Sequence, residues 1–80
     1  MRGRELLRLL MRPPLSYRII RQRGSHRRLA SDGGYPTISY AYHDADTVGP
    51  AAIRRVLIRQ IGLEPSACEA VLRGEDLDDQ

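Results

Sequence analysis

A block of strand-forming residues between two helical patterns limits the fold of this chain more than any other feature. On its N-terminal side, residues 4–12 place leucines at helical spacing with charged residues opposite, and Pro13 and Pro14 end the pattern. On its other side, residues 50–61 repeat apolar residues at helical spacing until Gly62. A chain of 80 residues has room for one small core, so we expect both helices to pack against the strands formed by the middle of the chain.

The middle of the chain is expected to form three strands. Residues 17–23 contain a tyrosine and two isoleucines without a breaker, and Gly24-Ser25 is a turn signal before a second strand at residues 26–30. After a turn-rich loop, residues 37–42 alternate with the period of a half-buried third strand. Short connections of this kind favour an antiparallel meander.

A shorter helical pattern follows at residues 65–72 and is closed by Gly74. The order is helix, three-stranded antiparallel sheet, helix and short C-terminal helix. It predicts an α+β domain over residues 1–74, with the helices on one face of the sheet. Residues 75–80 are acidic and are expected to form a disordered tail.

Composition argues against several classes of protein. No apolar run approaches the roughly 20 residues of a membrane span, and the first residues lack the apolar centre of a secretion signal. Cys68 is the single cysteine, which leaves no intrachain disulfide and no thiolate zinc cluster, and we expect it to be a small buried apolar residue. We therefore expect a cytoplasmic protein that does not contact membranes.

All thirteen basic residues are arginines, and their distribution is uneven. Residues 1–63 hold twelve of them against four acidic residues, whereas residues 64–80 hold one arginine and six acidic residues. The planar guanidinium group suits phosphate, so the basic part of the chain favours a polyanionic partner such as a nucleic acid. On the second long helix, Arg54, Arg55 and Arg59 either extend a phosphate-binding surface or form an ordinary solvated face.

The densest group of arginines surrounds the predicted turn between the first two strands. A turn exposes backbone N–H groups as well as side chains, so both can hold phosphate. Strand parity puts His26 and Arg28 on one face and Arg27 and Leu29 on the other, with Leu29 toward the helices. The candidate RNA contacts are Arg21, Arg23, Gly24, Ser25, Arg27 and Arg28, around His26 as the candidate catalytic residue.

Two interpretations of His26 are open on the residues alone. As a catalytic base, a neutral imidazole takes the proton of a ribose 2′-hydroxyl, which attacks the neighbouring phosphate, and the conjugate acid returns a proton to the leaving group. Arginines then stabilise charge on the phosphoryl oxygens, and no metal ion is required. As a structural residue, His26 is an ordinary turn histidine beside a solvated arginine face. Composition and spacing favour nucleic-acid binding over cleavage.

Other polar and aromatic residues also have two interpretations. His43 is a loop histidine bonded to backbone or to Asp44, or an auxiliary acid/base group. Tyr40 and Tyr42 share a strand face, where packing against the helices is favoured over base stacking. The spacing of the histidines and nearby aspartates fits no metal-ligand pattern, so we expect neither a metal nor another cofactor.

The segment Arg21-Gln22-Arg23-Gly24-Ser25-His26 resembles the signature of the HicA family of toxins from bacterial and archaeal toxin-antitoxin modules. Residues 4–10 look like the family's first helix, residues 37–44 like its third strand and following loop, and residues 53–63 like its second helix. Together these motifs cover about residues 3–73.

This resemblance implies a fold similar to a double-stranded-RNA-binding domain and a metal-independent ribonuclease that cleaves messenger RNA. The family's catalytic histidine corresponds to His26, and its small turn residues correspond to Gly24 and Ser25. The implied partner is a HicB-type antitoxin that covers the active surface, where acidic side chains would suit the arginines. The alternatives are a non-catalytic RNA-binding module of the same fold and a protein-interaction domain with a basic face.

Overall fold

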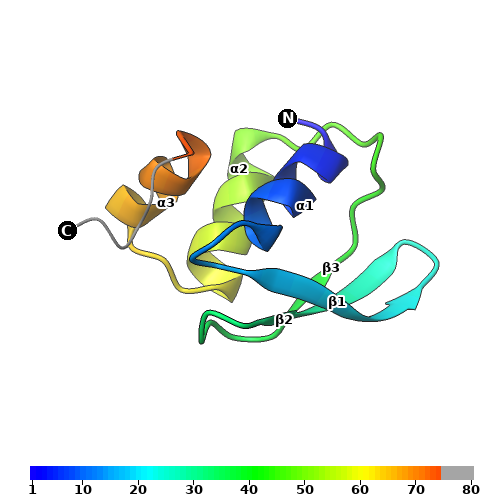
Figure 1. The fold of residues 1–80 in the computed structure, drawn as a ribbon. Coiled ribbons are helices and arrows are strands. Elements are labelled where there is room, and N and C mark those ends of the chain that lie inside the picture. Colours follow the sequence, from blue (N-terminus) through cyan, green and yellow to red (C-terminus); the bar gives the residue numbers. More distant parts are fainter. Residues whose placement is uncertain (75–80) are drawn as a thin grey trace.

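Three strands form one antiparallel sheet, and the helices lie on one side of it (Figure 1). The structure is a computed structural model and describes residues 1–74, so the tail expected at residues 75–80 lies outside the described residues. The strand order is β1-β2-β3, and both neighbouring pairs are antiparallel. This arrangement confirms the predicted α+β class and is consistent with a fold like that of a double-stranded-RNA-binding domain.

The first helix and the strands begin and end close to the predicted positions. Helix α1 spans Gly3–Met11, β1 spans Tyr17–Arg23 and β2 spans His26–Ser31. Strand β3 spans Ile38–Tyr40 and is shorter than the predicted residues 37–42. Beyond β3 the backbone bonds to the start of α1 instead of continuing along β2.

The second long helix has two kinds of winding. It begins as α2 at Pro50–Arg54 and continues as the π-helical segment η1 at Arg55–Gln60, whereas the sequence pattern predicts a regular helix throughout. At its end, the N–H of Ile61 donates to the carbonyl of Val56, five residues earlier, at 3.0 Å. The short helix α3 follows at Pro65–Leu72, as predicted.

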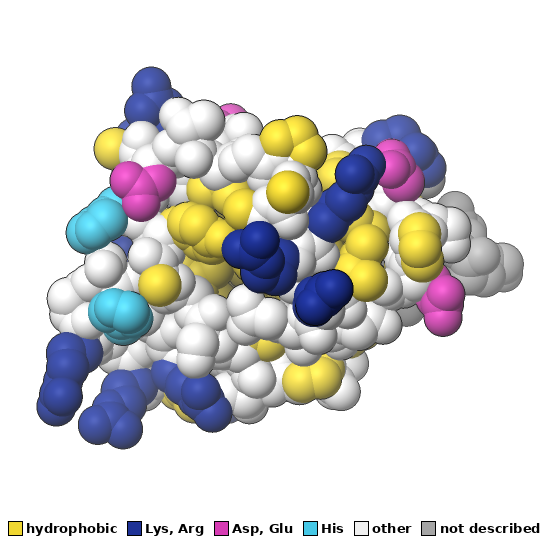
Figure 2. All heavy atoms as spheres, turned by 180° about the vertical axis from the view of Figure 1, so that it is seen from behind, with side chains coloured by type: hydrophobic (Ala, Val, Ile, Leu, Met, Phe, Trp, Pro, Cys, Tyr) yellow, Lys and Arg dark blue, Asp and Glu magenta, His cyan; other side chains and the backbone are white. Residues whose placement is uncertain are grey.

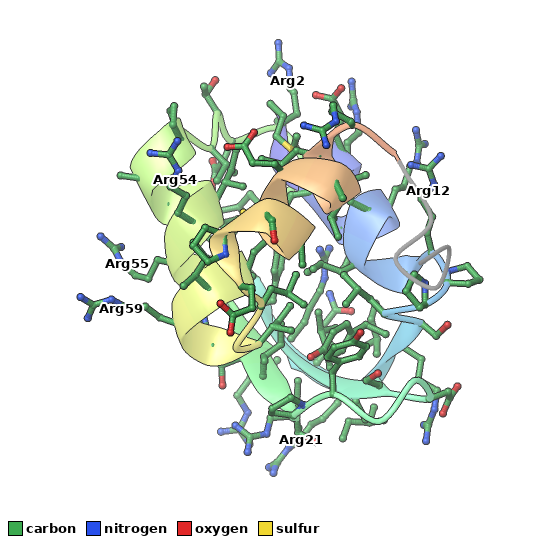
Figure 3. The ribbon with its side chains drawn as sticks, turned by 90° about the vertical axis from the view of Figure 1, so that its left-hand side faces the viewer. Arg2, Arg12, Arg21, Arg54, Arg55 and Arg59 are labelled. Carbon is green, nitrogen blue, oxygen red and sulfur yellow. The ribbon has the colours of Figure 1, made fainter. Side chains whose placement is uncertain are left out.

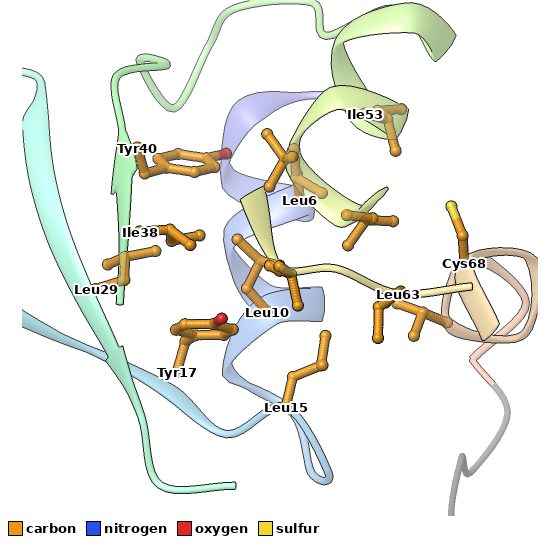
Figure 4. Packing of buried hydrophobic residues seen from close by; sticks show 14 of the residues in the cluster. Leu6, Leu10, Leu15, Tyr17, Leu29, Ile38, Tyr40, Ile53, Leu63 and Cys68 are labelled. Atoms are coloured by element: carbon orange, nitrogen blue, oxygen red, sulfur yellow. The ribbon is translucent and has the colours of Figure 1, made fainter. Parts of the chain in front are cut away.

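One cluster of apolar side chains forms the core: it fills the space between the sheet and the helices and continues between the helices to α3 (Figure 4). Cys68 is buried in it, which confirms its predicted role as a small apolar residue. In the part of the chain that the structure describes, no helix is long and apolar enough to cross a membrane. The largest fully buried side chains come from α1, the sheet, η1 and two connecting segments, namely Leu6, Leu10, Leu15, Leu29, Tyr40, Val48, Val56 and Leu57.

Tyr17 and Tyr40 should make the fold less stable at alkaline pH. Burial raises the pKa of each phenol to about 12. Their hydroxyls donate to the carbonyl oxygen of Pro36, at 2.6 Å, and to that of Gly3. An unfolded chain releases these protons near the ordinary tyrosine pKa of about 10. The stability that the two protonated phenols contribute is therefore fully present below about pH 10 and is lost as the pH rises through about 12. Thermal melts across this pH range would measure the loss.

Tyr17→Phe is the control for the alkaline decline in stability, because it removes one of the two phenols whose pKa is raised in the fold. The sequence contains no lysine, and arginine stays charged over this range. Cys68 acts in the same direction, since burial raises the pKa of its thiol, so both chains are compared with Cys68→Ala in place. We expect Tm to fall less steeply with rising pH in the Tyr17→Phe chain. An equally steep fall would assign the loss of stability to other groups.

Candidate active site

The turn between β1 and β2 carries the arginine-rich segment. Arg23 and His26 are paired across the two strands, so Gly24 and Ser25 form a two-residue hairpin loop. Gly24 has a φ of 59° and Ser25 has a negative φ, which is typical of a type II′ turn. Glycine at the first loop position permits this tight turn. The turn therefore places His26 at the start of β2, directly opposite Arg23.

A bulge in β1 decides which face of the sheet its arginines occupy. The register shifts between Ile19, which is opposite Leu29, and Arg21, which is opposite Arg28. Paired residues share a face, and Leu29 is buried against the helices. Arg21 and Arg28 therefore lie on the opposite, open face. Without the extra residue, Arg21 would share the face of Tyr17 and Ile19 on the helix side.

The open face gathers one imidazole and three guanidinium groups at the hairpin. Strand parity correctly predicts that His26 and Arg28 share this face, and the bulge adds Arg21 and Arg23 to them. Nη1 of Arg28 donates to Oγ of Ser39 in β3 at 3.0 Å. These side chains line most of an open hollow of about 230 Å³. We call this group the hairpin site: Arg21, Arg23, His26, Arg28 and Ser39.

No carboxylate within residues 1–74 neutralises the hairpin site. The side chains of Arg21, Arg23 and His26 are exposed and form no hydrogen bond or ion pair with the described residues. Arg28 bonds only to the neutral hydroxyl of Ser39 among these residues. In Figure 2, arginines gather below the lower of the two histidines, whereas the upper histidine lies beside an acidic side chain. Positive charge without compensation around an imidazole suits the phosphates of a nucleic acid.

Arg27 borders the hollow of the hairpin site, but its guanidinium group is turned to Asp44. Its side chain is 13% exposed, and Nη1 and Nη2 each lie 3.2 Å from Oδ1 of Asp44. Its Nε is buried and has no hydrogen-bond partner in the described part of the chain. Arg27 also lies opposite the buried Tyr40, which places it on the helix side of the sheet. Arg27 thus borders the same hollow as the hairpin site, but its guanidinium group is paired with Asp44, unlike those of the other arginines with which the sequence groups it.

His43 lies in the loop after β3 and is exposed. Its backbone N–H donates to Oδ2 of Asp46 at 2.9 Å, and its carbonyl accepts the N–H of Asp46 at 3.1 Å. The carbonyl of Asp46 in turn accepts the N–H of Gly3 at 2.8 Å. The start of α1 and the ion pair between Arg27 and Asp44 therefore hold this loop in place. Both histidines of the chain are visible on the face shown in Figure 2.

The tyrosines of β3 and the loop after it, and Ser25, are the remaining candidate residues. Tyr40 is 1% exposed, and its ring meets that of Tyr42 edge to face with centroids 5.4 Å apart, so packing is the correct interpretation for Tyr40. Ser25 is half-buried in the hairpin loop. Within residues 1–74, no group of three or more histidine, cysteine or acidic side chains comes together in a way that could hold a metal ion.

The comparisons with known proteins identify a family. The sequence matches the family described as HicA toxin of bacterial toxin-antitoxin systems over residues 3–63, which is more than half of the chain. The match contains α1, the complete sheet, α2, η1 and every residue of the hairpin site. No curated protein and no solved structure matches the chain. The chain therefore belongs to the HicA family of toxins from bacterial toxin-antitoxin systems.

Proposed function

We propose that this toxin is an endoribonuclease that cleaves messenger RNA with His26 as its acid/base group. The observation that carries this proposal is the exposed imidazole without a partner in residues 1–74, beside three arginines that no carboxylate there neutralises. Such a surface attracts the polyanionic RNA backbone. Imidazole is also the side chain best suited to exchange protons near neutral pH. Membership of a toxin family whose members are generally ribonucleases supports the same conclusion.

In this mechanism the RNA supplies its own nucleophile. Neutral His26 takes the proton from a ribose 2′-hydroxyl, and the 2′-oxygen attacks the adjacent phosphorus. The bond between phosphorus and the 5′-oxygen breaks, and that oxygen takes up a proton from the imidazolium or from water. One product strand ends in a 2′,3′-cyclic phosphate, and the other begins with a 5′-hydroxyl. Arg21, Arg23 and Arg28 stabilise the charge that grows on the phosphoryl oxygens.

The turn residues and Arg27 support this chemistry in different ways. Gly24 and Ser25 offer backbone N–H groups and a hydroxyl to the phosphate next to the cleaved bond. Arg27, which the sequence groups with the RNA contacts, is paired with Asp44, so we assign it to positioning the loop that carries His43. His43 stays a candidate for an auxiliary acid/base group on this face.

The toxin acts within a toxin-antitoxin system, so an antitoxin is its partner. We further propose that a HicB-type antitoxin inhibits it by covering the hairpin site with acidic side chains. Carboxylates that approach Arg21, Arg23 and Arg28 would occupy the positions of RNA phosphates. Binding of RNA and of antitoxin would then be mutually exclusive.

Incubation of the full chain with a mixed single-stranded RNA in excess chelator tests the proposed reaction. We expect fragments with 5′-hydroxyl ends and cyclic phosphates, because the 2′-oxygen is the nucleophile. DNA of the same sequence is the control and should stay intact, since it lacks the 2′-hydroxyl. Fragments with 5′-phosphate ends would contradict the mechanism. Loss of cleavage in chelator would show that a metal ion takes part.

A non-catalytic RNA-binding module is the second candidate. It is favoured by one observation, namely that no residue within 1–74 orients the imidazole of His26, whereas catalytic histidines are often oriented by a carboxylate. In such a module His26 would contact only phosphate or a 2′-hydroxyl. RNA binding that weakens with salt, without any cleavage, would support this alternative. Neither binding nor cleavage would indicate a protein-interaction domain.

A further inference from the structure

A second group of arginines lies away from the hairpin site, on α2 and η1. Arg54, Arg55 and Arg59 are all exposed, and we call them the helix patch. Residues 50–60 contain no acidic residue. Within residues 1–74, none of the three arginines forms an ion pair or a side-chain hydrogen bond. Together with Ala51 and Ile58 they line an open hollow of about 480 Å³.

The helix patch and the hairpin site lie on adjoining sides of the molecule, since Arg21 points downward in Figure 3 and the helix patch points to the left. Figure 3 shows Arg54, Arg55 and Arg59 pointing in one direction, away from the body of the fold and away from Arg12. In Figure 2, which looks onto that side, arginines gather in two places, one below the lower histidine and one over the second long helix. A single strand that runs around the edge between these two sides can therefore meet both groups.

Intrahelical stability does not explain the helix patch. Arg55 and Arg59 are four residues apart, and like charges at this spacing destabilise a helix. An exposed helix usually relieves such repulsion with acidic neighbours, and none is present between residues 50 and 60. Both arginines also lie on the π-helical segment η1, and π-helical turns occur frequently at functional sites. A bound anion would remove the repulsion.

We propose that the helix patch is a second phosphate-binding site for the RNA whose cleavage we assign to the hairpin site. This inference rests on the proposed function and adds a substrate requirement to it. An RNA of several nucleotides reaches from the hairpin site to the helix patch, whereas a very short RNA occupies the hairpin site alone. The patch therefore selects extended RNA through its backbone, without reading its sequence.

Binding of labelled RNA by the full chain with His26→Ala tests this proposal, because binding can then be measured without cleavage. The probes are single-stranded RNAs of about 4 and about 20 nucleotides, followed by fluorescence anisotropy at several salt concentrations. Replacing Arg54, Arg55 and Arg59 together by glutamine should weaken binding of the long RNA roughly 30- to 100-fold near 0.1 M salt. The slope of log K against log salt should fall by about 2, since each lost phosphate contact removes about 0.7. Binding of the short RNA should stay within about threefold.

The matched control replaces Arg4, Arg8 and Arg12 by glutamine and removes the same charge from another side of the molecule. Arg4 and Arg8 lie at helical spacing on α1, and Arg12 caps its C-terminal end. Arg12 lies opposite the helix patch (Figure 3). We expect a loss of less than about fivefold for both RNAs in this control, from the change in net charge alone. Equal losses in the two triple variants would overturn the inference and leave the helix patch as a solvated face. Absence of RNA binding in the parent chain would instead overturn the proposed function, and this inference with it.

Discussion

His26→Ala should abolish RNA cleavage while leaving RNA binding and folding intact. Loss of general acid–base catalysis lowers a rate by about 10²- to 10⁴-fold. The arginines of the hairpin site remain, so the RNA affinity should stay within about threefold. The imidazole is exposed and bonds to no residue within 1–74, so the free energy of unfolding should change by less than about 0.5 kcal/mol. Cleavage rate, RNA affinity and Tm are measured on the same preparations.

His43→Ala is the matched control for this experiment, because the chain has two histidines and both are exposed. We expect the cleavage rate to persist in His43→Ala. A full rate in His26→Ala would move the catalytic centre away from the hairpin site. A pH–rate profile with two ionisations, one of which disappears in His43→Ala, would contradict the mechanism with one histidine and make His43 the second acid/base group.

Elements with strong local signals could be predicted from the sequence. Two prolines end α1, and Gly24-Ser25 separates β1 from β2, so these boundaries depend on residues that restrict the backbone locally. The end of β3 depends on a distant contact, because the loop after it bonds to the start of α1. The π-helical winding of η1 could not be predicted either. The buried residues of α2 and η1, which are Ile53, Val56 and Leu57, have the spacing of a regular helix. The sequence of η1 therefore carries no separate signal.

The composition of the hairpin site could be predicted more easily than its orientation. Parity within β2 correctly separates His26 and Arg28 from Leu29, since that strand is regular. Parity fails in β1, where the bulge reverses the faces of the residues that follow it. It also cannot show that Arg27 pairs with Asp44 of a later loop. The bulge and the ion pair are tertiary features, and together they determine which arginines surround the histidine.

Gly3→Ala should destabilise the fold by about 2 to 3 kcal/mol, although alanine normally stabilises a helix relative to glycine. A Cβ atom at Gly3 would lie 2.1 Å from the carbonyl oxygen of His43, closer than any real contact. The loop would have to move, and the bond from Gly3 N–H to the Asp46 carbonyl at 2.8 Å would be lost with it. The bond from Arg4 N–H to the Asp44 carbonyl, at 3.1 Å, would be strained as well. Thermal or urea unfolding measures the loss, which corresponds to a fall in Tm of roughly 10 to 20 °C.

Gly24→Ala separates this steric effect from the general cost of replacing a glycine. No atom lies within 4 Å of a Cβ at Gly24, so only its φ of +59° opposes alanine, at a cost of about 1 to 2 kcal/mol. Gly3→Ala should therefore lower the free energy of unfolding by at least as much as Gly24→Ala does. Helix propensity alone would predict the opposite, a gain in stability, at Gly3. Gly3→Ala should also break the ion pair between Arg27 and Asp44, because Asp44 lies in the loop that has to move. A Gly3→Ala chain as stable as the parent would show that the loop carrying His43 is free to shift, and that its contact with Gly3 does not fix the position of His43.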